Sequence, residues 1–244
     1  MDEWYKDWFD SEEYLIVYRN RNEKEAGRLV DLILNNIEIK AGAKVLDMAC
    51  GTGRHSILFA RKGFDVTAID LSRNLLSIAI QAATEENIKI NFIRSDVRHF
   101  TLNNDFALAV NLFTSFGYFQ TDEENFLIIK NAFEHLAFQG YFVIDFLNRN
   151  FVEDNLVPET KVEYRDKFIF QKRRIENDRV IKQITIRKNG TEKIYHESVK
   201  MYSQNELSGL ISEAGFKIKS CFGDYSGNKF DLKTSPRIII IAQK

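Results

Sequence analysis

Val45-Leu46-Asp47-Met48-Ala49-Cys50-Gly51-Thr52-Gly53 is an apolar strand-like run that ends in an acid and continues as a turn of small residues. A helix-forming run follows, and a second strand-like run ends in Asp70, seventeen residues after Gly53. Strand, glycine-rich turn, helix, strand and terminal acid together describe a βαβ unit that binds a nucleotide. Glycine at 51 and 53 allows close approach of the backbone to a ligand, and the helix directs its free N–H groups toward it.

The turn departs from the two common phosphate-binding patterns. A dinucleotide fingerprint requires a third glycine where this chain has Ser56, and the Gly-Lys-Ser/Thr of a Walker loop is absent. Asp47 precedes the turn, where its negative charge would repel a phosphate. An acid followed by a glycine turn suits a ligand that has a cationic part and a ribose but no phosphate. S-adenosylmethionine is such a ligand.

Segment 46–53 closely resembles motif I of the class I S-adenosylmethionine-dependent methyltransferases. Segments 69–72 and 95–97 resemble the second and third motifs of that family. Segment 111–118 is similar to the stretch after the fourth strand in its small-molecule branch. The chain is therefore expected to be a methyltransferase with S-adenosylmethionine as its cofactor.

The resemblance covers residues 40–148 by motif and residues 204–244 by the order of elements. It departs at Ala49, where many members of the family have glycine. One extra methyl group is tolerated there if the backbone φ angle is negative.

The fold expected is α/β, with a Rossmann-like seven-stranded, mostly parallel sheet and helices on both faces. Alternating strands and helices require a parallel sheet with right-handed crossovers. The resemblance adds the strand order 3-2-1-4-5-7-6, with strand 7 antiparallel. Strands are predicted at 43–48, 65–70, 90–94, 105–111, 141–146, 216–222 and 236–243. Helices are predicted at 22–37, 54–62, 73–86, 122–137 and 204–214, and short aromatic helices within 1–20.

Residues 160–202 follow a different pattern, because apolar side chains alternate there with period two. The Asn189-Gly190 pair is a strong hairpin signal, since both positions of such a turn need positive φ. We predict an antiparallel β meander of about three strands, inserted after strand 5. The expected division is a helical lid segment at 1–39, a cofactor-binding domain at 40–150 and 203–244, and a substrate or oligomerisation subdomain at 151–202.

The resemblance also implies roles for individual residues on the cofactor side. Asp47 would orient the methionine ammonium, directly or through water, and Asp70 would hold the ribose. Asp96 would accept the adenine amino group, and this role is favoured over the alternative that it caps a helix. The remaining residues of the implied cofactor site are Ala49, Cys50, Gly51, Gly53, Leu71, Val97 and Asn111.

Tyr14, Tyr18 and Arg21 share one helix face at spacings of four and three residues. In related small-molecule methyltransferases such a segment covers the cofactor. Arg21 or Arg54 could form a bidentate ion pair with the methionine carboxylate. The alternative is aromatic packing of a terminal helix beside a solvated arginine. The sequence does not separate these two interpretations.

Methyl transfer from a sulfonium is an in-line displacement that needs positioning and water exclusion, with no metal and no covalent nucleophile. The catalytic residues therefore stay unassigned. Candidates for the methyl-acceptor side follow strands 4 and 5 and the meander, and the chief ones are Tyr118, Tyr202 and Asp145, with Thr114, Ser115 and Asn148 as further possibilities. The Asn/Asp-Pro-Pro-Tyr pattern of amino-directed nucleic-acid methyltransferases is absent, so the expected acceptor is an N or O atom of a small molecule.

Composition narrows the class of partner. The net charge of −1 argues against a dedicated nucleic-acid binder, and two cysteines give neither a disulfide framework nor a metal-binding spacing. The N-terminus carries no signal peptide, and the longest apolar runs are of strand length, so a cytoplasmic monomer or homodimer with no membrane contact is expected. A nicotinamide-dependent oxidoreductase, a non-catalytic cofactor-binding protein and an RNA methyltransferase stay open as alternatives.

Overall fold

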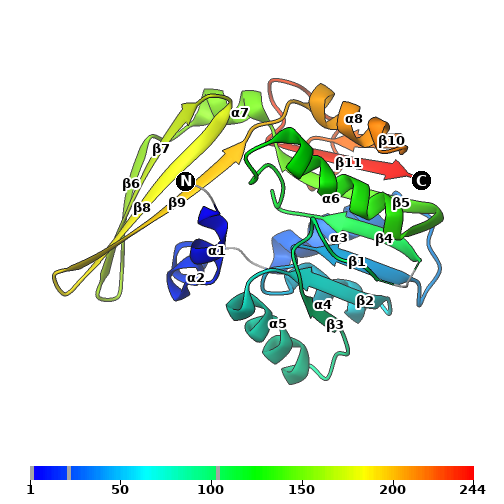
Figure 1. Cartoon of the computed structure of the whole chain (residues 1–244), viewed down its shortest axis with the longest axis horizontal. Coiled ribbons are helices and arrows are strands. Elements are labelled where there is room, and N and C mark those ends of the chain that lie inside the picture. The colour runs from blue at the N-terminus through cyan, green and yellow to red at the C-terminus, as the bar shows by residue number, and fades with distance from the viewer. Residues whose placement is uncertain (1–2, 21–22, 103–104) are drawn as a thin grey trace.

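The computed structural model describes residues 3–20, 23–102 and 105–244 (Figure 1). Its helices are α1 (Trp4–Phe9), α2 (Glu12–Val17), α3 (Glu23–Leu34), α4 (Arg54–Arg61), α5 (Arg73–Glu85), α6 (Asp122–His135), α7 (Arg149–Asn155) and α8 (Gln204–Glu213). Its strands are β1 (Lys44–Met48), β2 (Asp65–Asp70), β3 (Asn91–Arg94), β4 (Phe106–Asn111), β5 (Leu136–Leu147), β6 (Glu159–Tyr164), β7 (Lys167–Glu176), β8 (Arg179–Lys188), β9 (Thr191–Lys200), β10 (Lys217–Phe222) and β11 (Arg237–Gln243).

The main sheet has seven strands in the order β10-β11-β5-β4-β1-β2-β3. Strands β3, β2, β1, β4 and β5 pair in parallel, whereas β11 runs antiparallel to both β5 and β10. The predicted order and the antiparallel seventh strand are therefore confirmed. Between β1 and β4 the chain reverses its direction of travel across the sheet, and such a switch point is where open α/β sheets bind ligands.

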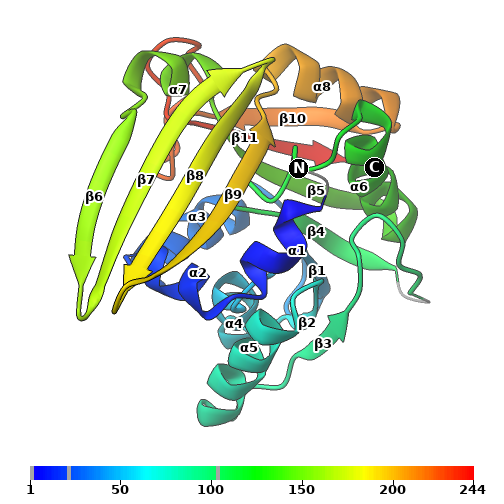
Figure 2. The same ribbon diagram turned by 60° about the vertical axis from the view of Figure 1, so that its left-hand side comes forward.

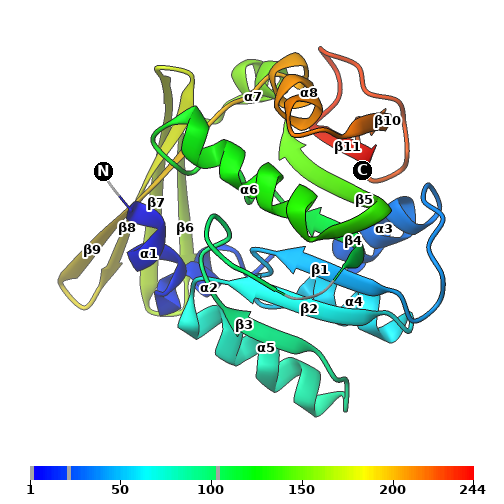
Figure 3. The same cartoon turned by 45° about the vertical axis from the view of Figure 1, so that its right-hand side comes forward.

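Helices cover both faces of this sheet, as Figure 3 shows. The apolar side chains of α3 and α4 share one buried cluster with strands β1, β2, β4, β5 and β11. On the opposite face, α6 and α8 share a second cluster with the same strands. Residues Ile238–Ile241 of β11 are buried with no exposed surface, because alternate side chains enter the two clusters.

A second, four-stranded antiparallel sheet in the order β6-β7-β8-β9 extends beside the main domain (Figure 2). The meander thus has four strands where about three were predicted, because Glu159–Tyr164 also pairs. Helix α7 was not predicted, and β5 begins at Leu136 instead of 141. The turn at Asn189-Gly190 is confirmed, with φ angles of 48° and 78°.

Helices α1 and α2 lie between the meander and the main sheet (Figures 1 and 2). Trp8 of α1 has no exposed surface and lies 4.8 Å, ring centre to ring centre, from Tyr195 of β9. On the other side, the Asp10 carboxylate accepts hydrogen bonds from the Ser72 hydroxyl and the Asn74 N–H, each at 2.8 Å. The N-terminal helices therefore bridge the meander and the start of α5.

The meander joins the main domain at Gly117, in the segment that follows β4. The Lys200 N–H donates to the Gly117 carbonyl at 2.8 Å, and the Arg179 guanidinium donates to the same oxygen at 3.2 Å. Gly117 has a φ of 81°, and a β-carbon placed there would lie 2.7 Å from the Lys200 carbonyl oxygen. Close approach of these two backbones thus requires glycine.

We predict that Gly117→Ala lowers the free energy of unfolding by roughly 2–4 kcal/mol. This range adds the cost of a left-handed backbone at a residue with a β-carbon to the cost of overpacking against Lys200. Gly190→Ala is the matched control, since Gly190 has a φ of 78° but no atom within 4 Å of the added carbon. It should cost about 1 kcal/mol. Urea unfolding measures the stability of both variants. Equal losses of stability would show that the close approach of the meander to Gly117 does not make this position more sensitive to a β-carbon.

Candidate functional site

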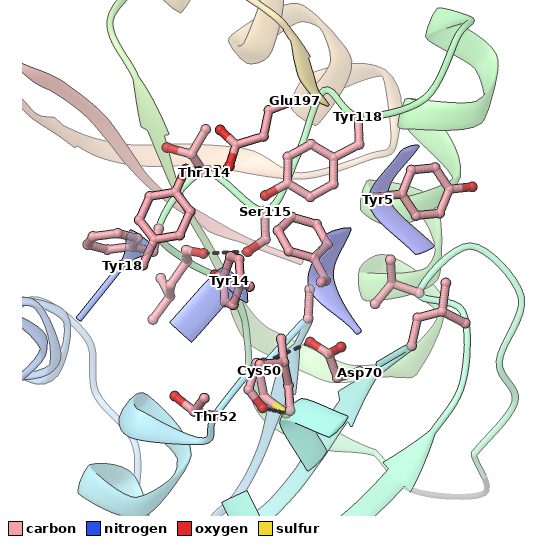
Figure 4. A pocket seen from close by; sticks show the side chains of 18 of the residues that line it. Tyr5, Tyr14, Tyr18, Cys50, Thr52, Asp70, Thr114, Ser115, Tyr118 and Glu197 are labelled. Atoms are coloured by element: carbon pink, nitrogen blue, oxygen red, sulfur yellow. Dashed lines mark hydrogen bonds between the residues drawn. The ribbon is translucent and has the colours of Figure 1, made fainter. Parts of the chain in front are cut away.

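A cavity of about 350 Å³ lies at the carboxyl ends of β1, β2 and β4, beneath helices α1 and α2. Its floor is the turn after β1 and the end of β2, and its walls come from the segments after β3 and β4 and from β9 (Figure 4). The lining residues are Trp4, Tyr5, Phe9, Tyr14, Leu15, Tyr18, Arg19, Ala49, Cys50, Gly51, Thr52, Arg54, His55, Asp70, Leu71, Leu75, Asp96, Val97, Leu112, Phe113, Thr114, Ser115, Tyr118, Phe119, Glu197 and Val199.

The turn after β1 forms the floor of this cavity. Ala49 has a φ of 62°, so the negative φ under which an extra methyl group is easily tolerated is not found there. The Cys50 N–H donates to the Ile69 carbonyl at 2.9 Å, and this hydrogen bond fixes the turn against β2. Left-handed backbone costs a non-glycine residue about 1–2 kcal/mol, so the turn is held in a strained state.

The two glycines of the turn serve different purposes. Gly51, with a φ of 57°, lines the cavity and exposes bare backbone to it. Gly53, with a φ of 74°, faces α5 instead, where an added β-carbon would lie 2.9 Å from the Ala79 β-carbon. Gly53 was expected to face the ligand, but its place in the structure allows α4 and α5 to pack closely.

Asp70, at the end of β2, links two turns beside the cavity. One carboxylate oxygen accepts the Gly51 N–H at 2.7 Å, and the other accepts the Ser72 N–H at 2.8 Å. Burial raises the pKa of Asp70, and these two hydrogen bonds only partly oppose that rise. The side chain lines the cavity, as predicted for the ribose-binding acid (Figure 4).

Asp47 lies one layer behind the cavity and is not among its lining residues. Only 1% of it is exposed, and its carboxylate accepts the Ser56 hydroxyl at 2.5 Å. Burial raises the pKa of Asp47 to about 6, in spite of the Ser56 hydrogen bond, and the negative charge of Asp70 adds to the rise. Any effect of Asp47 on a ligand must therefore act through the turn or through a bridging water.

Leu71, Asp96 and Val97, expected on the adenine side, all line the cavity. The Asp96 carboxylate forms an ion pair with Arg98, with a nitrogen–oxygen distance of 2.7 Å. Burial would raise the pKa of Asp96, but the Arg98 guanidinium outweighs it and holds that pKa below its usual value. Asp96 is thus an ionised hydrogen-bond acceptor at neutral pH.

The N-terminal helices supply Tyr14 and Tyr18 to the cavity, as predicted. Arg21 lies outside the described residues. Arg54, the other candidate for a carboxylate contact, lines the cavity beside the turn, 5.1 Å from the centre of the Phe113 ring. These positions agree with a cover over the cavity.

Glu197 of β9 lines the cavity, although the sequence interpretation missed it (Figure 4). Its carboxylate accepts Trp8 Nε1 at 2.6 Å, the Tyr18 hydroxyl at 2.5 Å and Lys182 Nζ at 2.9 Å. Burial would raise the pKa of Glu197, but Lys182 and these donors lower it overall. The inward position of an acid in an alternating strand was the available signal. This cluster ties the N-terminal helices to the meander.

On the expected acceptor side, Thr114, Ser115 and Tyr118 line the cavity, whereas Tyr202 and Asp145 do not. The Tyr202 hydroxyl donates to Asp122 at 2.5 Å. Its ring packs on Phe116 and Phe146, since an aromatic side chain at the end of the meander finds apolar partners on the main sheet.

Asp145 has no exposed surface and forms an ion pair with Arg237 at 2.8 Å. Asn148 caps helix α7. Asn111 is also fully buried, and its amide donates to the Met48 and Ser115 carbonyls, each at 3.1 Å. None of these residues lines the cavity; Asn111 and Tyr202 instead contact the segment after β4 that forms one wall.

The described part of the chain holds no group of three or more histidine, cysteine, aspartate or glutamate residues that could bind a metal ion. Among its helices, none combines the length and apolar character that crossing a bilayer requires.

Residues 45–140 match the family model described as "Methyltransferase domain". A dTDP-3-amino-3,4,6-trideoxy-alpha-D-glucopyranose N,N-dimethyltransferase of Streptomyces venezuelae is 30% identical over 121 residues, 50% of this chain and 48% of the relative. A dTDP-4-amino-2,3,4,6-tetradeoxy-D-glucose N,N-dimethyltransferase of Saccharopolyspora spinosa is 31% identical over 121 residues, 50% of this chain and 46% of the relative. The chain thus matches less than half the length of each of these two relatives.

A solved structure of a S-adenosylmethionine-dependent methyltransferase from Clostridium acetobutylicum ATCC 824 superposes with a TM-score of 0.79. The match covers 94% of each chain at 20% sequence identity. At this identity the likeness concerns the fold. It confirms the Rossmann-like architecture over nearly the whole chain, meander included.

We predict that Asp47→Asn raises the free energy of unfolding at pH 8 by about 3 kcal/mol, which is the cost of ionising a carboxyl group whose pKa is raised from its ordinary value to about 6. The folded-state pKa of about 6 lies above the unfolded value, so the native state binds more protons between these values. Ionisation of Asp47 therefore removes stability as pH rises through that window, and the amide escapes this cost.

At pH 4 the carboxyl group is protonated in the native state, so the gain should nearly vanish there. The exposed Asp65 at the start of β2 gives the matched control Asp65→Asn, which should change stability by under about 0.5 kcal/mol at both pH values. Denaturant unfolding at the two pH values is the measurement. A gain of equal size at pH 4 and pH 8 would contradict the account.

Proposed function

We propose that this chain, whose residues 45–140 are a class I methyltransferase domain, transfers a methyl group from S-adenosylmethionine to a nitrogen atom of a small molecule. The observation that carries the proposal is the cavity at the switch point of the sheet. It combines the bare backbone of Gly51 with the carboxylate of Asp70, the two features that the methionine and ribose parts of the cofactor require.

The residues around the cavity fit this cofactor. Asp70 would hold the ribose hydroxyls, while Leu71 and Val97 would contact the two faces of the adenine. The start of α4 presents backbone N–H groups to the methionine carboxylate, with Arg54 beside them.

Bound S-adenosylmethionine would supply an activated methyl group, so the protein has to position the acceptor and exclude water. Trp4, Phe9 and Tyr118 pack edge to face or tilted, with ring centres 5.2–5.6 Å apart, and close the cavity from the side of the N-terminal helices. Aromatic faces attract cations, and this favours both a sulfonium and an amine in the same cavity.

Nitrogen as the accepting atom is supported by the relatives that are named as N,N-dimethyltransferases of amino sugars. A protonated amine must lose its proton before it attacks, and a carboxylate or a phenolate at the wall can accept it directly or through water. Tyr118 is the candidate for this contact, because its ring lines the cavity beside Thr114 and Ser115 (Figure 4).

The direct experiment incubates the protein with S-adenosylmethionine and pairs of acceptors that differ only in an amino or a hydroxyl group, amino sugars included. We expect S-adenosylhomocysteine and a methylated product with the amines. Methylated products from the hydroxyl compounds alone would show that the accepting atom is oxygen and not nitrogen. Binding of NADH in the absence of any binding of S-adenosylmethionine would overturn it.

We predict that Asp70→Asn weakens the binding of S-adenosylhomocysteine by about 10- to 100-fold, which corresponds to the loss of hydrogen bonds to a charged group. Asp65→Asn, at the opposite end of the same strand, should leave the dissociation constant unchanged. Isothermal titration calorimetry measures both variants. If Asp70→Asn bound S-adenosylhomocysteine as tightly as the unaltered protein, Asp70 would not be the residue that holds the ribose.

A further inference from the structure

Two adjacent cavity residues, Phe113 and Thr114, adopt left-handed backbone conformations with φ angles of 60° and 64°. Neither is glycine, and both lie in the segment after β4 that forms one wall of the cavity. Such conformations are unfavourable for residues with a β-carbon, and they persist only where the surroundings impose them. Two in succession at a ligand cavity indicate that something nearby fixes this part of the wall.

Asp145 of β5 holds both residues from behind. Its carboxylate accepts the Phe113 N–H at 2.9 Å, and its main-chain carbonyl accepts the Thr114 N–H, also at 2.9 Å. The side chain of Asp145 has no exposed surface. One residue thus accepts consecutive N–H groups, an arrangement that the left-handed conformations of Phe113 and Thr114 make possible.

Asp145 is itself fixed by partners from the C-terminal part of the chain. Arg237 of β11 donates from Nε to the carboxylate at 2.8 Å and from Nη2 to the carbonyl at 3.3 Å. The Tyr225 hydroxyl donates to the carboxylate at 2.9 Å. Burial would lower the pKa of Arg237, but Asp145 beside it raises that pKa overall, so the guanidinium stays charged.

The rest of the wall has other supports. The Asn111 amide donates to the Ser115 carbonyl at 3.1 Å, and Arg179 donates to the carbonyls of residues 117–119, each at 3.2 Å. The Asp145 contacts therefore act on the start of the segment, where the backbone is least favourable and where the Thr114 side chain enters the cavity (Figure 4).

We propose that Asp145, held by Arg237 and Tyr225, is a positioning residue that keeps Phe113 and Thr114 left-handed and so sets the shape of the acceptor wall. This inference rests on the proposed function, because it assigns the wall to the methyl acceptor. Without the carboxylate, the two residues would relax toward negative φ and carry Thr114 and Ser115 out of place. If the ion pair had only a structural role, its loss would instead lower the stability of the protein without changing the geometry of the wall.

The first test is Asp145→Asn, with Tyr225→Phe as the milder variant that keeps the ion pair. We expect amide exchange in residues 112–116 of Asp145→Asn to become at least tenfold faster, with exchange in β8 unchanged. The affinity for S-adenosylhomocysteine should change less than threefold, while kcat/KM for the acceptor falls at least tenfold. Tyr225→Phe should give smaller changes in the same direction. Unaltered exchange in 112–116 would overturn the proposal.

A second pair of variants decides the matter even if Asp145→Asn does not fold. Thr114→Ala and Thr114→Gly remove the same hydroxyl and methyl groups, but only glycine frees the backbone from its left-handed strain. We expect Thr114→Gly to be at least as stable as Thr114→Ala, yet to exchange faster in 112–116 and to have a kcat/KM at least fivefold lower. Equal exchange and equal kcat/KM would contradict the positioning role.

The two proposals fail in different ways. Amide exchange needs no ligand, so it tests the hold of Asp145 on the wall whether or not an acceptor is known. If the unaltered protein neither binds S-adenosylmethionine nor methylates any acceptor, the proposed function fails while the exchange result stands. If it methylates amines and Asp145→Asn does so equally well, the positioning role fails alone.

Discussion

The hydrogen bonds of one carboxylate, Asp70, hold together the two turns that frame the cavity. Its oxygens accept the N–H groups of Gly51 and Ser72, so the turn after β1 and the turn after β2 keep a fixed distance. This arrangement carries an energetic cost, because the side chain is buried near the second acid, Asp47, and the pKa of each is raised. A cationic ligand in the cavity would relieve that cost, and this couples the stability of the domain to its occupancy.

Charged side chains also hold the walls of the cavity in place. Asp145 fixes the start of the wall after β4, Arg179 fixes its end, and Glu197, which itself lines the cavity, fixes the helices that cover it. Each comes from a different part of the chain, namely β5, β8 and β9. The meander is thus coupled to the cofactor domain through backbone carbonyls and N-terminal side chains, and not through an apolar contact alone.

The sequence predicted the parallel strands, the family resemblance added their order, and Ala49, Cys50, Gly51 and Asp70 line the floor of the cavity as predicted, because strand–turn–helix signals are local features. Asp47 and Gly53 were predicted for the same site, but they do not line the cavity.

The acids of the walls were predicted only in part. Asp145 lies near the end of β5 and Tyr202 just after β9, but long-range partners, Arg237 and Asp122, hold their side chains away from the cavity. For Glu197 the inward position of an acid in an alternating strand was the available signal, and its partner Lys182 comes from another strand.

The central claim is that the cavity above the turn at 49–53 binds an adenosyl compound without phosphates. A crystal structure of the protein grown with S-adenosylhomocysteine tests it most directly. The account predicts density in the cavity, with the ribose hydroxyls within hydrogen-bond distance of the Asp70 carboxylate and the adenine between Leu71 and Val97. Density for the compound elsewhere on the protein, or for a pyrophosphate-bearing coenzyme in that cavity, would contradict it.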